Sequence, residues 1–346
     1  MPDKIRIGIV GLGTTGQIRK DIVEKTPGLD LVAVSDAHRP NMPRVEKFHY
    51  FEDYRKLLDS DIDAVIVAPQ NKYRPKVVTS ALEKGIHVLC ETPPGRSVDD
   101  IRNIIDAEKK TKGVILQFGF TFRFHGAVQK TRELLDSKIS GKILWMRGSY
   151  GKSGGTDFES TWRSNREWAG GGILLDQGIH ILDLFRLFAG DFSEVKSMVD
   201  TSFWNISLED NAFALMRTKE GQIASLHASS AHWKNRYLLE ICLEDGFVSV
   251  RGDLSPDGRF GPSERFIFSP RVPNQEKGET GSETVTDFPI SDSWRHELDA
   301  FADQIRGAET HPPCGSSGDA LAAMKLVDKI YRNDRRWVDQ GNLSGK

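Results

Sequence analysis

The sequence predicts an α/β protein of two domains. A doubly wound domain with a parallel sheet is expected over residues 1–120, and a second α/β domain with a mostly antiparallel sheet over residues 121–346. In the first domain, apolar runs alternate with helical stretches, and each run is continuous, as in strands buried on both faces of a parallel sheet. After Phe120, strand-like runs follow one another without helices between them, which is typical of an antiparallel sheet.

The first domain contains five predicted strands, with the sequences IRIGIV, LDLVAVS, DAVIVA, IHVLC and GVILQF. Two of the segments between them, RPKVVTSALEKG and SVDDIRNIIDAEKKTKG, carry apolar residues at helical spacing. These two helices are expected to end at Gly85 and Gly113, because glycine readily adopts the left-handed conformation that closes many helices. The alternation of strands and helices predicts the doubly wound arrangement.

The second domain is expected to begin with an amphipathic helix at about 125–138, a strand ILWMRGSY and a glycine-rich loop. Further strands are predicted from about 194 to 268. Residues 252–289 are rich in Gly, Pro, Ser and charged residues, so we expect a long surface loop or insertion there. Two helices, near 292–306 and 318–332, are predicted to follow.

Composition limits the classes of partner. The formal net charge of −2 gives no electrostatic reason to expect binding to nucleic acid or to an anionic membrane. No run of 18 apolar residues occurs, and the N-terminus lacks the pattern of a signal peptide. The three cysteines lie far apart and in no metal-binding spacing, which favours a reducing compartment. We therefore expect a cytoplasmic protein without a bound metal.

A glycine motif, Gly11-Leu12-Gly13-Thr14-Thr15-Gly16, follows the first predicted strand and opens a helix. The first glycine allows a tight turn, the second lets the backbone approach a pyrophosphate, and the third lets the helix pack on the strand. The phosphates of a dinucleotide are then expected at the helix N-terminus, around Thr14 and Thr15, where free N–H groups favour anions. The alternative is a purely structural glycine turn.

An acidic residue in the expected place favours dinucleotide binding over that alternative. Asp36 lies twenty residues past Gly16, at the end of the second predicted strand. A carboxylate there accepts hydrogen bonds from the adenosine ribose and repels a 2′-phosphate, so we expect NAD. Arg39 follows three residues later and could pair with a 2′-phosphate, so NADP is the alternative cofactor.

A second informative stretch, GGGILLDQGIHILDLFRLF, spans residues 170–188. If it is helical from about Ile173, then Asp176, His180 and Asp183 share one face. The favoured interpretation is a carboxylate–imidazole pair for proton transfer. A buried polar cluster is the second, and a metal site is the third, because a single helix rarely supplies a full set of ligands.

Taken together, these motifs resemble the glucose–fructose oxidoreductase/inositol dehydrogenase family (Gfo/Idh/MocA). The resemblance covers nearly the whole chain and is carried by GLGTTG, CETPPG, WAGGGILLDQGIHILDL, DAVIVAPQN, FGFTFRF and SWRHELDAFADQIRG. It implies a Rossmann domain and an α/β domain with a large open sheet that often forms homodimers or homotetramers. It also implies reversible hydride transfer between a nicotinamide and a secondary hydroxyl, usually of a sugar or cyclitol.

The resemblance also implies roles for single residues. Asn71, Glu91 and Pro93 match family positions near the cofactor, and Asp176 and His180 match the pair expected at the reacting hydroxyl. The strand-end motif of the family is Glu-Lys-Pro, whereas this chain has Thr92 at the place of the lysine. Gln70 and Arg74 replace a usual proline and histidine.

Threonine in place of lysine weakens but does not exclude catalysis. The Thr92 hydroxyl can form a hydrogen bond, but it carries no charge and cannot act as a base near neutral pH. Losing one charge-assisted hydrogen bond costs about 1.5–3 kcal/mol, at most about a hundredfold in rate. His180 is suited as the base, because an ordinary imidazole has a pKa of about 6.5. We therefore predict His180, Asp176 and Thr92 as the catalytic group.

The loop before the catalytic segment is expected to contact substrate. Aromatic and cationic side chains suit a polar or ring-shaped ligand, and a packed surface loop is the equally weighted alternative. With one arginine from the motif FGFTFRF, the predicted substrate contacts are Arg123, Lys152, Trp162 and Arg163. His232 and Trp233 lie on a predicted strand and are assigned to a subunit interface in preference to the chemical site.

The sequence thus predicts an NAD(P)-dependent dehydrogenase that acts on a sugar, cyclitol or sugar nucleotide. The alternative is a sensor or scaffold that binds the cofactor but has lost turnover, because the family lysine is missing at Thr92.

Overall fold

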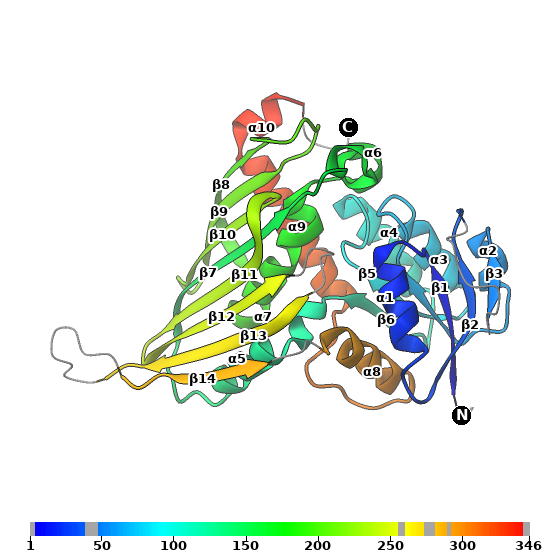
Figure 1. Ribbon diagram of the computed structural model, residues 1–346, viewed down its shortest axis with the longest axis horizontal. Coiled ribbons are helices and arrows are strands. Elements are labelled where there is room, and N and C mark those ends of the chain that lie inside the picture. The colour runs from blue at the N-terminus through cyan, green and yellow to red at the C-terminus, as the bar shows by residue number, and fades with distance from the viewer. Residues whose placement is uncertain (1–3, 39–47, 255–259, 273–280, 289–291, 342–346) are drawn as a thin grey trace. The chain divides into compact units, whose positions relative to one another are not determined.

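The computed structural model describes residues 4–38, 48–254, 260–272, 281–288 and 292–341 (Figure 1). The chain forms two compact units. The first comprises Met1–Thr121, Glu167–Gly170 and Trp294–Leu321. The second comprises Phe122–Arg166, Gly171–Ser293 and Ala322–Lys346.

A six-stranded sheet forms the centre of the first unit, in the order β3-β2-β1-β4-β5-β6. All five strand pairs are parallel. The strands are β1 (Ile5–Val10), β2 (Leu29–Ser35), β3 (His49–Phe51), β4 (Ala64–Val67), β5 (His87–Glu91) and β6 (Leu116–Gly119). The predicted doubly wound parallel sheet is confirmed, and in such a sheet ligands gather at the carboxyl ends of the strands.

A helix follows each of the strands β1, β3, β4 and β5. These helices are α1 (Thr14–Val23), α2 (Tyr54–Leu58), α3 (Arg74–Glu83) and α4 (Val98–Glu108). Helix α4 begins where Ser97 Oγ accepts a hydrogen bond from the backbone N–H of Asp100, a normal N-cap. Gly85 and Gly113 have φ of +76° and +73°, so the predicted left-handed conformation is confirmed, although α4 already ends at Glu108, before Gly113.

A late segment of the chain returns to the first unit. Helix α8 (Ser293–Ile305) contributes Leu298, Phe301 and Ala302 to the buried cluster that also contains Ile7 and Ile9 of β1. This helix was predicted in the second domain, because a single domain boundary after residue 120 assigns every later residue to that domain. Such a boundary cannot show that a later segment packs on the core of the first domain.

The second unit is built on an eight-stranded sheet with the order β14-β13-β12-β11-β7-β10-β9-β8. The β10–β7 pair is parallel, and the other six pairs are antiparallel, so the predicted mostly antiparallel sheet is confirmed. Its strands are β7 (Ile143–Ser153), β8 (Phe192–Asp200), β9 (Asn211–Thr218), β10 (Ile223–Ser229), β11 (Ala231–Leu243), β12 (Gly246–Leu254), β13 (Phe260–Pro270) and β14 (Thr284–Phe288).

The two faces of this sheet have different surroundings. Helix α7 (Ile179–Ala189) packs on one face, where Gly148 leaves room for the side chains of Ile181 and Phe185. On the other face, strand β9 exposes every second residue, including Phe213 and Leu215. Further helices after the first sheet are α5 (Gly126–Asp136), α9 (Ser317–Asn333) and α10 (Arg335–Asp339).

The predicted loop or insertion at 252–289 is wrong in part. Residues 260–270 form β13, which pairs with β12, and residues 284–288 form β14, which pairs with β13. Backbone pairing with an existing sheet edge overrides the weak strand propensity of a segment rich in Gly and Pro. Residues 255–259 and 273–280 lie outside the described residues.

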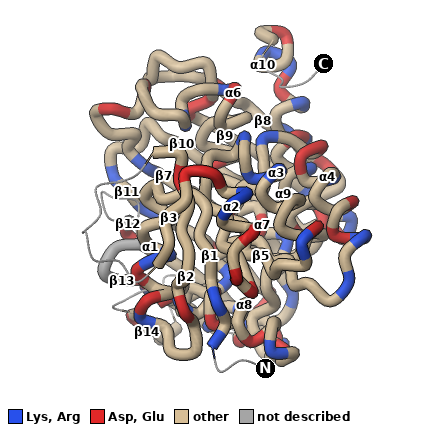
Figure 2. The backbone as a smooth tube through the Cα atoms, turned by 90° about the vertical axis from the view of Figure 1, so that its right-hand side faces the viewer, with Lys and Arg blue, Asp and Glu red and all other residues tan. Residues whose placement is uncertain are grey.

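Lysine and arginine are interspersed with aspartate and glutamate along the chain (Figure 2). This mixture agrees with the small formal net charge of −2. Among the described residues, no helix is long and apolar enough to cross a membrane.

Candidate active site

The glycine motif forms a tight turn between β1 and α1. Gly11 has a φ of +92°, and a Cβ there would lie 2.5 Å from the backbone nitrogen of Pro69. A Cβ on Gly16 would lie 1.8 Å from the Gly11 carbonyl oxygen, so this glycine allows the helix to pack against the turn. A Cβ on Gly13 would meet nothing within 4 Å. The second glycine therefore borders open space, as a position that approaches a pyrophosphate should.

The start of α1 can hold an anion. Gly13 is the N-cap residue, and no side chain caps the first turn. Gly13 and Thr14 are exposed, and Thr15 is partly exposed. The N–H groups of the first turn point along the helix axis, and the helix dipole favours negative charge there. These features fit the phosphates of a dinucleotide.

Asp36 stands at the end of β2, next to this turn. One carboxylate oxygen accepts a hydrogen bond of 2.6 Å from the backbone N–H of Leu12, and the other accepts one of 3.0 Å from His38. The carboxylate is thus fixed beside the glycine motif, where a ribose is expected in this type of fold. Arg39, predicted to contact a 2′-phosphate, lies outside the described residues.

Thr92 directly follows β5, at the carboxyl end of the strand. Its hydroxyl donates a 3.0 Å hydrogen bond to the carbonyl oxygen of Gly119, the last residue of the neighbouring strand β6. The Thr92–Pro93 peptide is cis. The Pro93 carbonyl accepts a 2.7 Å hydrogen bond from Arg74. Thr92 is partly exposed and lies at the carboxyl end of β5, and this end of the strands is where ligands gather in parallel sheets.

Glu91 has a different environment from the one predicted. Its carboxylate is buried and forms a 2.6 Å ion pair with Arg19, which also pairs with Glu297 of α8. Burial raises the pKa of Glu297 to about 7; the positive charge of Arg19 acts in the opposite direction, and the negative charge of Glu91 acts in the same direction as burial. The Glu91 side chain thus anchors α1 through Arg19, which in turn holds α8 through Glu297, and the predicted cofactor contact of Glu91 stays a prediction.

Asn71 also serves a local contact. Its side-chain N–H donates a 2.9 Å hydrogen bond to the carbonyl oxygen of Ala169, and the residue is 1% exposed. Asn71 thus attaches the segment Glu167–Gly170 to the first unit, together with an ion pair between Lys72 and Glu167. The predicted cofactor contact of Asn71 stays a prediction beside this internal hydrogen bond.

The catalytic segment of the second unit starts with a π-helical turn, Leu174–Gly178, which continues into α7. The expected helix from about Ile173 is thus present, with a wider first turn. Buried Glu209 fixes its start, because its carboxylate accepts hydrogen bonds from the backbone N–H groups of Gly172 and Leu174. Wide turns of this kind occur often at functional sites.

His180 lies in an aromatic environment. Its ring stacks on Phe122 with the ring centroids 5.0 Å apart, and Phe122 also contacts His125 and Tyr237. The residue keeps part of its surface exposed, but the surrounding rings remove much of its water. This burial lowers the pKa of His180 from 6.5 to about 4, although the negative charge of Asp176 acts in the opposite direction. The imidazole is therefore neutral at pH 7.

Two of the predicted substrate residues, Arg163 and Trp162, lie beside Asp176. Its carboxylate lies 3.5 Å from Arg163 Nε, and the Arg163 guanidinium lies 4.5 Å from the centroid of the Trp162 ring. Burial and the nearby charge of Asp176 raise the pKa of Tyr150, so its phenol stays protonated at pH 7. Asp176, His180, Arg163 and Trp162 thus form one group, and Lys152 lies near the end of β7.

Arg123 is not part of this group. Its side chain is buried, and it forms a bidentate ion pair with Asp183, with one hydrogen bond of 2.7 Å and a second of 2.5 Å. The Arg123 guanidinium thus forms a buried structural ion pair, and its predicted substrate contact stays a prediction. Asp183 is likewise separated from the proton-transfer pair with which it shares a helix.

One buried pair of titratable side chains, next to Phe122, was not predicted from the sequence. His125 Nδ1 forms a short hydrogen bond with Glu264, and both side chains are buried. Glu264 belongs to β13, inside the segment that was predicted to be a loop. The strand-like run ERFIFS was the one signal that could have placed this glutamate in the sheet.

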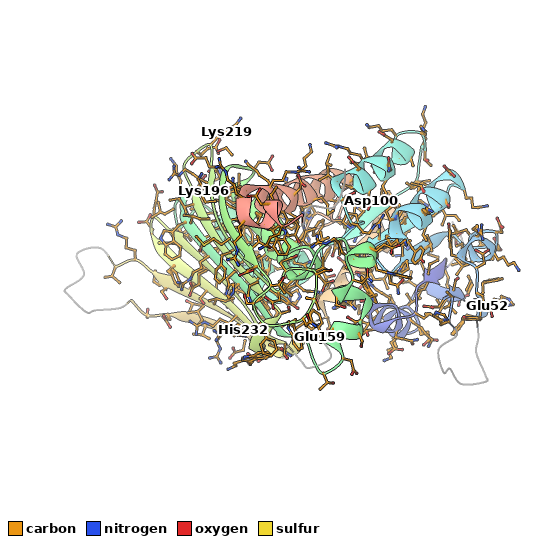
Figure 3. The ribbon with its side chains drawn as sticks, turned by 90° about the horizontal axis from the view of Figure 1, so that it is seen from above. Glu52, Asp100, Glu159, Lys196, Lys219 and His232 are labelled. Carbon is orange, nitrogen blue, oxygen red and sulfur yellow. The ribbon has the colours of Figure 1, made fainter. Side chains whose placement is uncertain are left out.

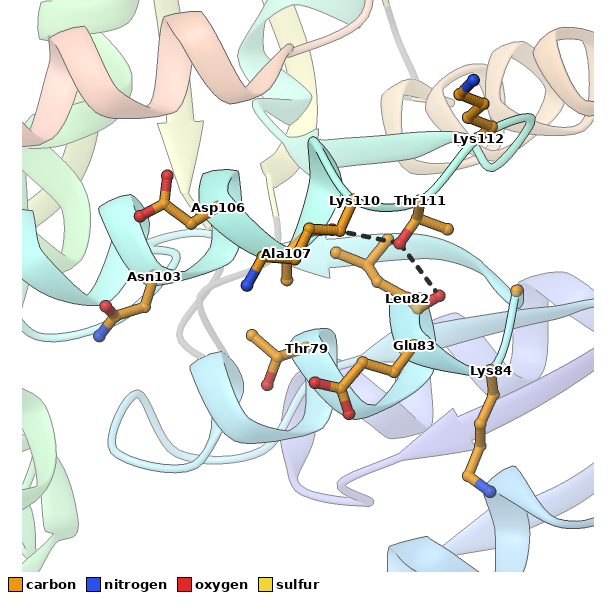
Figure 4. Close-up of a pocket in the computed structure, with 11 residues that line it drawn as sticks. Thr79, Leu82, Glu83, Lys84, Asn103, Asp106, Ala107, Lys110, Thr111 and Lys112 are labelled. Carbon is orange, nitrogen blue, oxygen red and sulfur yellow. Dashed lines mark hydrogen bonds between the residues drawn. The ribbon is translucent and has the colours of Figure 1, made fainter.

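A groove of about 890 Å³ lies between α3 and α4 of the first unit (Figure 4). Its lining includes Gly85, which precedes β5, so it opens at the amino end of that strand. Parallel sheets bind ligands at the opposite end, so this groove does not belong to the candidate site. No group of three or more potential metal ligands occurs within the described residues.

These features define a class of protein. A glycine turn with an uncapped helix, an aspartate at the end of β2 and a neutral histidine beside a carboxylate are typical of a nicotinamide-dependent oxidoreductase. Residues 5–120 match the sequence model of the oxidoreductase family with an NAD-binding Rossmann fold, and residues 128–249 match the GFO/IDH/MocA C-terminal domain. The chain belongs to the Gfo/Idh/MocA family, and the prediction of an NAD(P)-dependent dehydrogenase is confirmed.

Individual relatives agree with this membership. D-glucoside 3-dehydrogenase of Escherichia coli (strain K12) is 28% identical, and the match covers 95% of each chain. Levoglucosan dehydrogenase of Pseudarthrobacter phenanthrenivorans is 26% identical over 54% of each chain, so this match spans about half the length of that relative. A levoglucosan dehydrogenase solved with NADH and levoglucosan has a TM-score of 0.80 at 20% identity, covering 96% of this chain and 98% of that one, which shows the fold.

Proposed function

We propose that the protein is an NAD-dependent dehydrogenase that oxidises a secondary hydroxyl of a pyranose-type sugar or glycoside, or reduces the corresponding ketone. The observation that carries this proposal is the neutral His180 imidazole, stacked on Phe122 and electrostatically coupled to Asp176. When bound, the nicotinamide supplies the hydride acceptor or donor. The chain must then supply a group that takes or returns the hydroxyl proton.

His180 is the proton acceptor in this proposal. Because its pKa is about 4, the imidazole is unprotonated and can accept a hydrogen bond from the hydroxyl. Asp176 stabilises the imidazolium that forms when the proton arrives. Arg163 and Trp162 offer a cationic and an aromatic contact beside Asp176, which suits a polar ring.

The names of the relatives support the substrate class. The two relatives named above are dehydrogenases of levoglucosan and of D-glucosides, both of which are sugar derivatives. A sugar nucleotide or a cyclitol remains within the same chemical class, because each presents a ring with secondary hydroxyls.

NAD is the proposed cofactor, with Gly11, Gly13, Thr14, Thr15 and Gly16 around its phosphates and Asp36 at its ribose. The carboxylate of Asp36 is fixed next to the glycine motif, where it repels a 2′-phosphate. We also propose that the protein acts in the cytoplasm, because no disulfide joins its three cysteines. Location of a tagged chain by cell fractionation tests this second point.

Thr92 has an auxiliary role in this proposal. It donates a hydrogen bond to Gly119 and has no charge, so we expect Thr92→Ala to lose less than about tenfold in turnover. Thr92→Lys should retain or raise activity, because the family carries lysine there. A complete loss of turnover in Thr92→Ala would show that threonine has taken over an essential task.

The central test follows NADH absorbance at 340 nm during incubation with glucosides, aldoses, cyclitols and sugar nucleotides. His180→Ala should reduce kcat by about 100-fold or more while NADH binding is kept. The matched control is His49→Ala, which replaces an exposed histidine at the start of β3. If no compound is oxidised while NADH still binds, the proposal fails and the chain is a cofactor-binding sensor or scaffold.

We further propose that the open face of the eight-stranded sheet joins two copies of the chain in a homodimer or homotetramer. Met198, Phe213 and Leu215 are 76%, 48% and 53% exposed on this face. They line a shallow groove of about 480 Å³. Contiguous apolar surface of this kind usually marks an interface. Each protomer would have to bury about 800 Å² there, which an eight-stranded face can supply.

Light scattering after gel filtration tests this association. Leu215→Glu should produce a monomer, because it places a charge in the apolar face. Ile139→Glu is the matched control, since Ile139 is 79% exposed and lies outside the sheet. A monomeric wild-type protein at micromolar concentration would refute the association.

A further inference from the structure

Four aromatic side chains meet on the surface of the second unit. Phe203 lies 4.7 Å from Trp233 and 5.0 Å from Trp204, measured between ring centroids, and Phe158 lies 5.1 Å from Trp204. We call this group, Phe158, Phe203, Trp204 and Trp233, the aromatic corner. Its members come from three separate segments: the loop after β7, the loop after β8 and strand β11.

Local contacts hold the three segments together. Gly154 leaves room for Phe158 and Trp204, because a Cβ there would lie 2.6 Å from the first ring and 2.7 Å from the second. The Trp204 indole N–H donates a 3.0 Å hydrogen bond to the carbonyl oxygen of Ser230. Glu159 accepts a 2.9 Å hydrogen bond from the backbone N–H of Asn205. The aromatic corner is thus a built feature and not a chance meeting of loops.

The pairing of strand β11 with β7 is irregular around Trp233. The register with β7 shifts between Ala231 and Arg236, so the residues between them leave the regular ladder. Within this irregular stretch, the Asn235 side chain accepts a 2.8 Å hydrogen bond from the backbone N–H of Ser153. A bulge in a strand commonly redirects a side chain near a functional site. Here it presents Trp233 to solvent.

Two of the four rings are largely exposed. Phe203 is 60% exposed and Trp233 is 63% exposed, and their planes meet at 77°. The contact between them therefore places the edge of one ring on the face of the other, and both rings keep much of their surface exposed. Adjacent exposed aromatic rings indicate a binding site more strongly than single exposed apolar residues do.

We propose that the aromatic corner binds a second sugar ring, one that is linked to the sugar that is oxidised. This inference rests on the proposed function for its substrate class. A pyranose has an apolar C–H face that packs on an aromatic ring, and its hydroxyls need hydrogen-bonding groups at the rim. Glu159 and Asn205, which lie next to Phe158 and Trp204 in the sequence, provide a carboxylate and an amide. Figure 3 labels Glu159 and His232 at the same edge of the second unit.

The same loop connects the aromatic corner with Asp176. Phe158 and Glu159 belong to a short 3₁₀ turn, and the next turn, Trp162–Ser164, carries the Arg163 that contacts Asp176. Arg163 follows Phe158 by five positions along the chain, so their Cα atoms are at most about 18 Å apart. A linked sugar ring or two can bridge such a distance. The substrate is therefore an oligosaccharide or a glycoside with a sugar-like second group.

A second copy of the chain is a weaker candidate for this surface. A fully buried aromatic side chain covers about 150–250 Å², so two partly exposed rings offer about 300 Å². A stable interface needs about 800 Å² from each partner. The area thus matches a sugar ring and not a subunit.

Calorimetric titration of the full chain with cellotetraose, maltotetraose and D-glucose, without cofactor, tests the proposal. At least one tetrasaccharide should bind at least tenfold tighter than glucose, and Trp233→Ala should remove at least tenfold of that affinity. The matched control is Trp145→Ala, which removes a partly exposed tryptophan of β7 and should leave binding unchanged. Thermal unfolding of each variant shows whether it is folded, and Phe203→Ala provides a second variant of the same site.

Three outcomes overturn the inference: neither tetrasaccharide binds, Trp233→Ala and Phe203→Ala bind like the wild type, or Trp233→Ala changes the oligomeric state without changing saccharide binding. The last result identifies the aromatic corner as a subunit contact. Failure of the proposed function gives a different result, because saccharide binding then persists while no sugar is oxidised.

Discussion

Gly13→Ala should separate cofactor binding from folding. Gly13 has a φ of −66°, which alanine adopts without strain, and its missing Cβ would meet no atom within 4 Å. In the protein without cofactor, alanine is therefore tolerated. It should stabilise the chain by about 0.4–1 kcal/mol, because it restricts the unfolded state. Such a change moves Tm by no more than about 2–4 °C.

The effect on the cofactor should be much larger. The added methyl group occupies the open space at the start of α1, where a pyrophosphate would approach the N–H groups. Losing one charge-assisted hydrogen bond costs about 1.5–3 kcal/mol, which weakens binding about 10- to 150-fold. Isothermal titration with NAD⁺ should therefore show a Kd at least tenfold above the wild-type value, at an unchanged or slightly higher Tm.

Two further glycines provide controls. Gly318 is exposed at the start of α9 and meets only an ordinary contact at 3.5 Å, so Gly318→Ala should raise Tm by a similarly small amount and leave the Kd for NAD⁺ unchanged. Gly16→Ala should lower Tm strongly, because its Cβ would collide with the Gly11 carbonyl. If Gly13→Ala binds NAD⁺ as tightly as the wild type, the glycine turn is structural and the phosphates lie elsewhere.

Four further predictions follow from the described contacts. Asp36→Asn keeps an acceptor for Leu12 but removes the charge, so the expected preference of about tenfold or more for NAD⁺ over NADP⁺ should shrink in parallel titrations. Glu297→Gln should raise Tm above pH 7 but not near pH 5. The pKa of Glu297 is raised in the folded protein, so the stability that its protonated carboxyl contributes is present below about pH 4.5 and is lost as the pH rises through about 7. Glutamine does not titrate and therefore avoids this loss. The low pKa of His180 predicts that kcat/KM stays flat from pH 8 down to about 5, and a midpoint near 6.5 would contradict it. Arg123→Ala should lower the free energy of unfolding by about 3–5 kcal/mol, whereas Arg163→Ala should raise KM with little change in Tm.

The sequence predicted the parallel sheet well, because strands buried on both faces leave long apolar runs. It could not predict that α8 returns to the core of the first unit, since the apolar stripe of a helix does not say which sheet covers it. It assigned residues 264–268 of β13 both to a strand and to a loop, and it missed β14, because the pairing of these strands depends on the sheet edges supplied by β12 and β13. Local patterns thus gave the elements, and long-range contacts decided where the last of them belong.

For the candidate site, the motifs picked out the segments that carry the charged residues but did not predict the partner of each charge. Asp176 and Asp183 lie on one helical segment, yet Arg163 contacts the first and Arg123 is buried against the second. A charged residue in a motif can face a ligand or hold the backbone in place, and both tasks favour the same residue types.

The burial of a charged side chain indicates which of these two tasks it performs, because separating a buried charge from its partner costs free energy. Arg123 and Asp183 are almost completely removed from water, so neither charge can leave its partner for a substrate without a cost of several kcal/mol. Arg163 is 37% exposed and lies 3.5 Å from Asp176, so exchanging this contact for a substrate costs little. The same reasoning divides the strand-end motif CETPPG. Glu91 is held by buried Arg19, and partly exposed Thr92 is the residue of that motif that can turn toward a ligand. The chemistry of this chain therefore depends on its half-exposed polar residues, and the fully buried charges keep the segments that carry them in position.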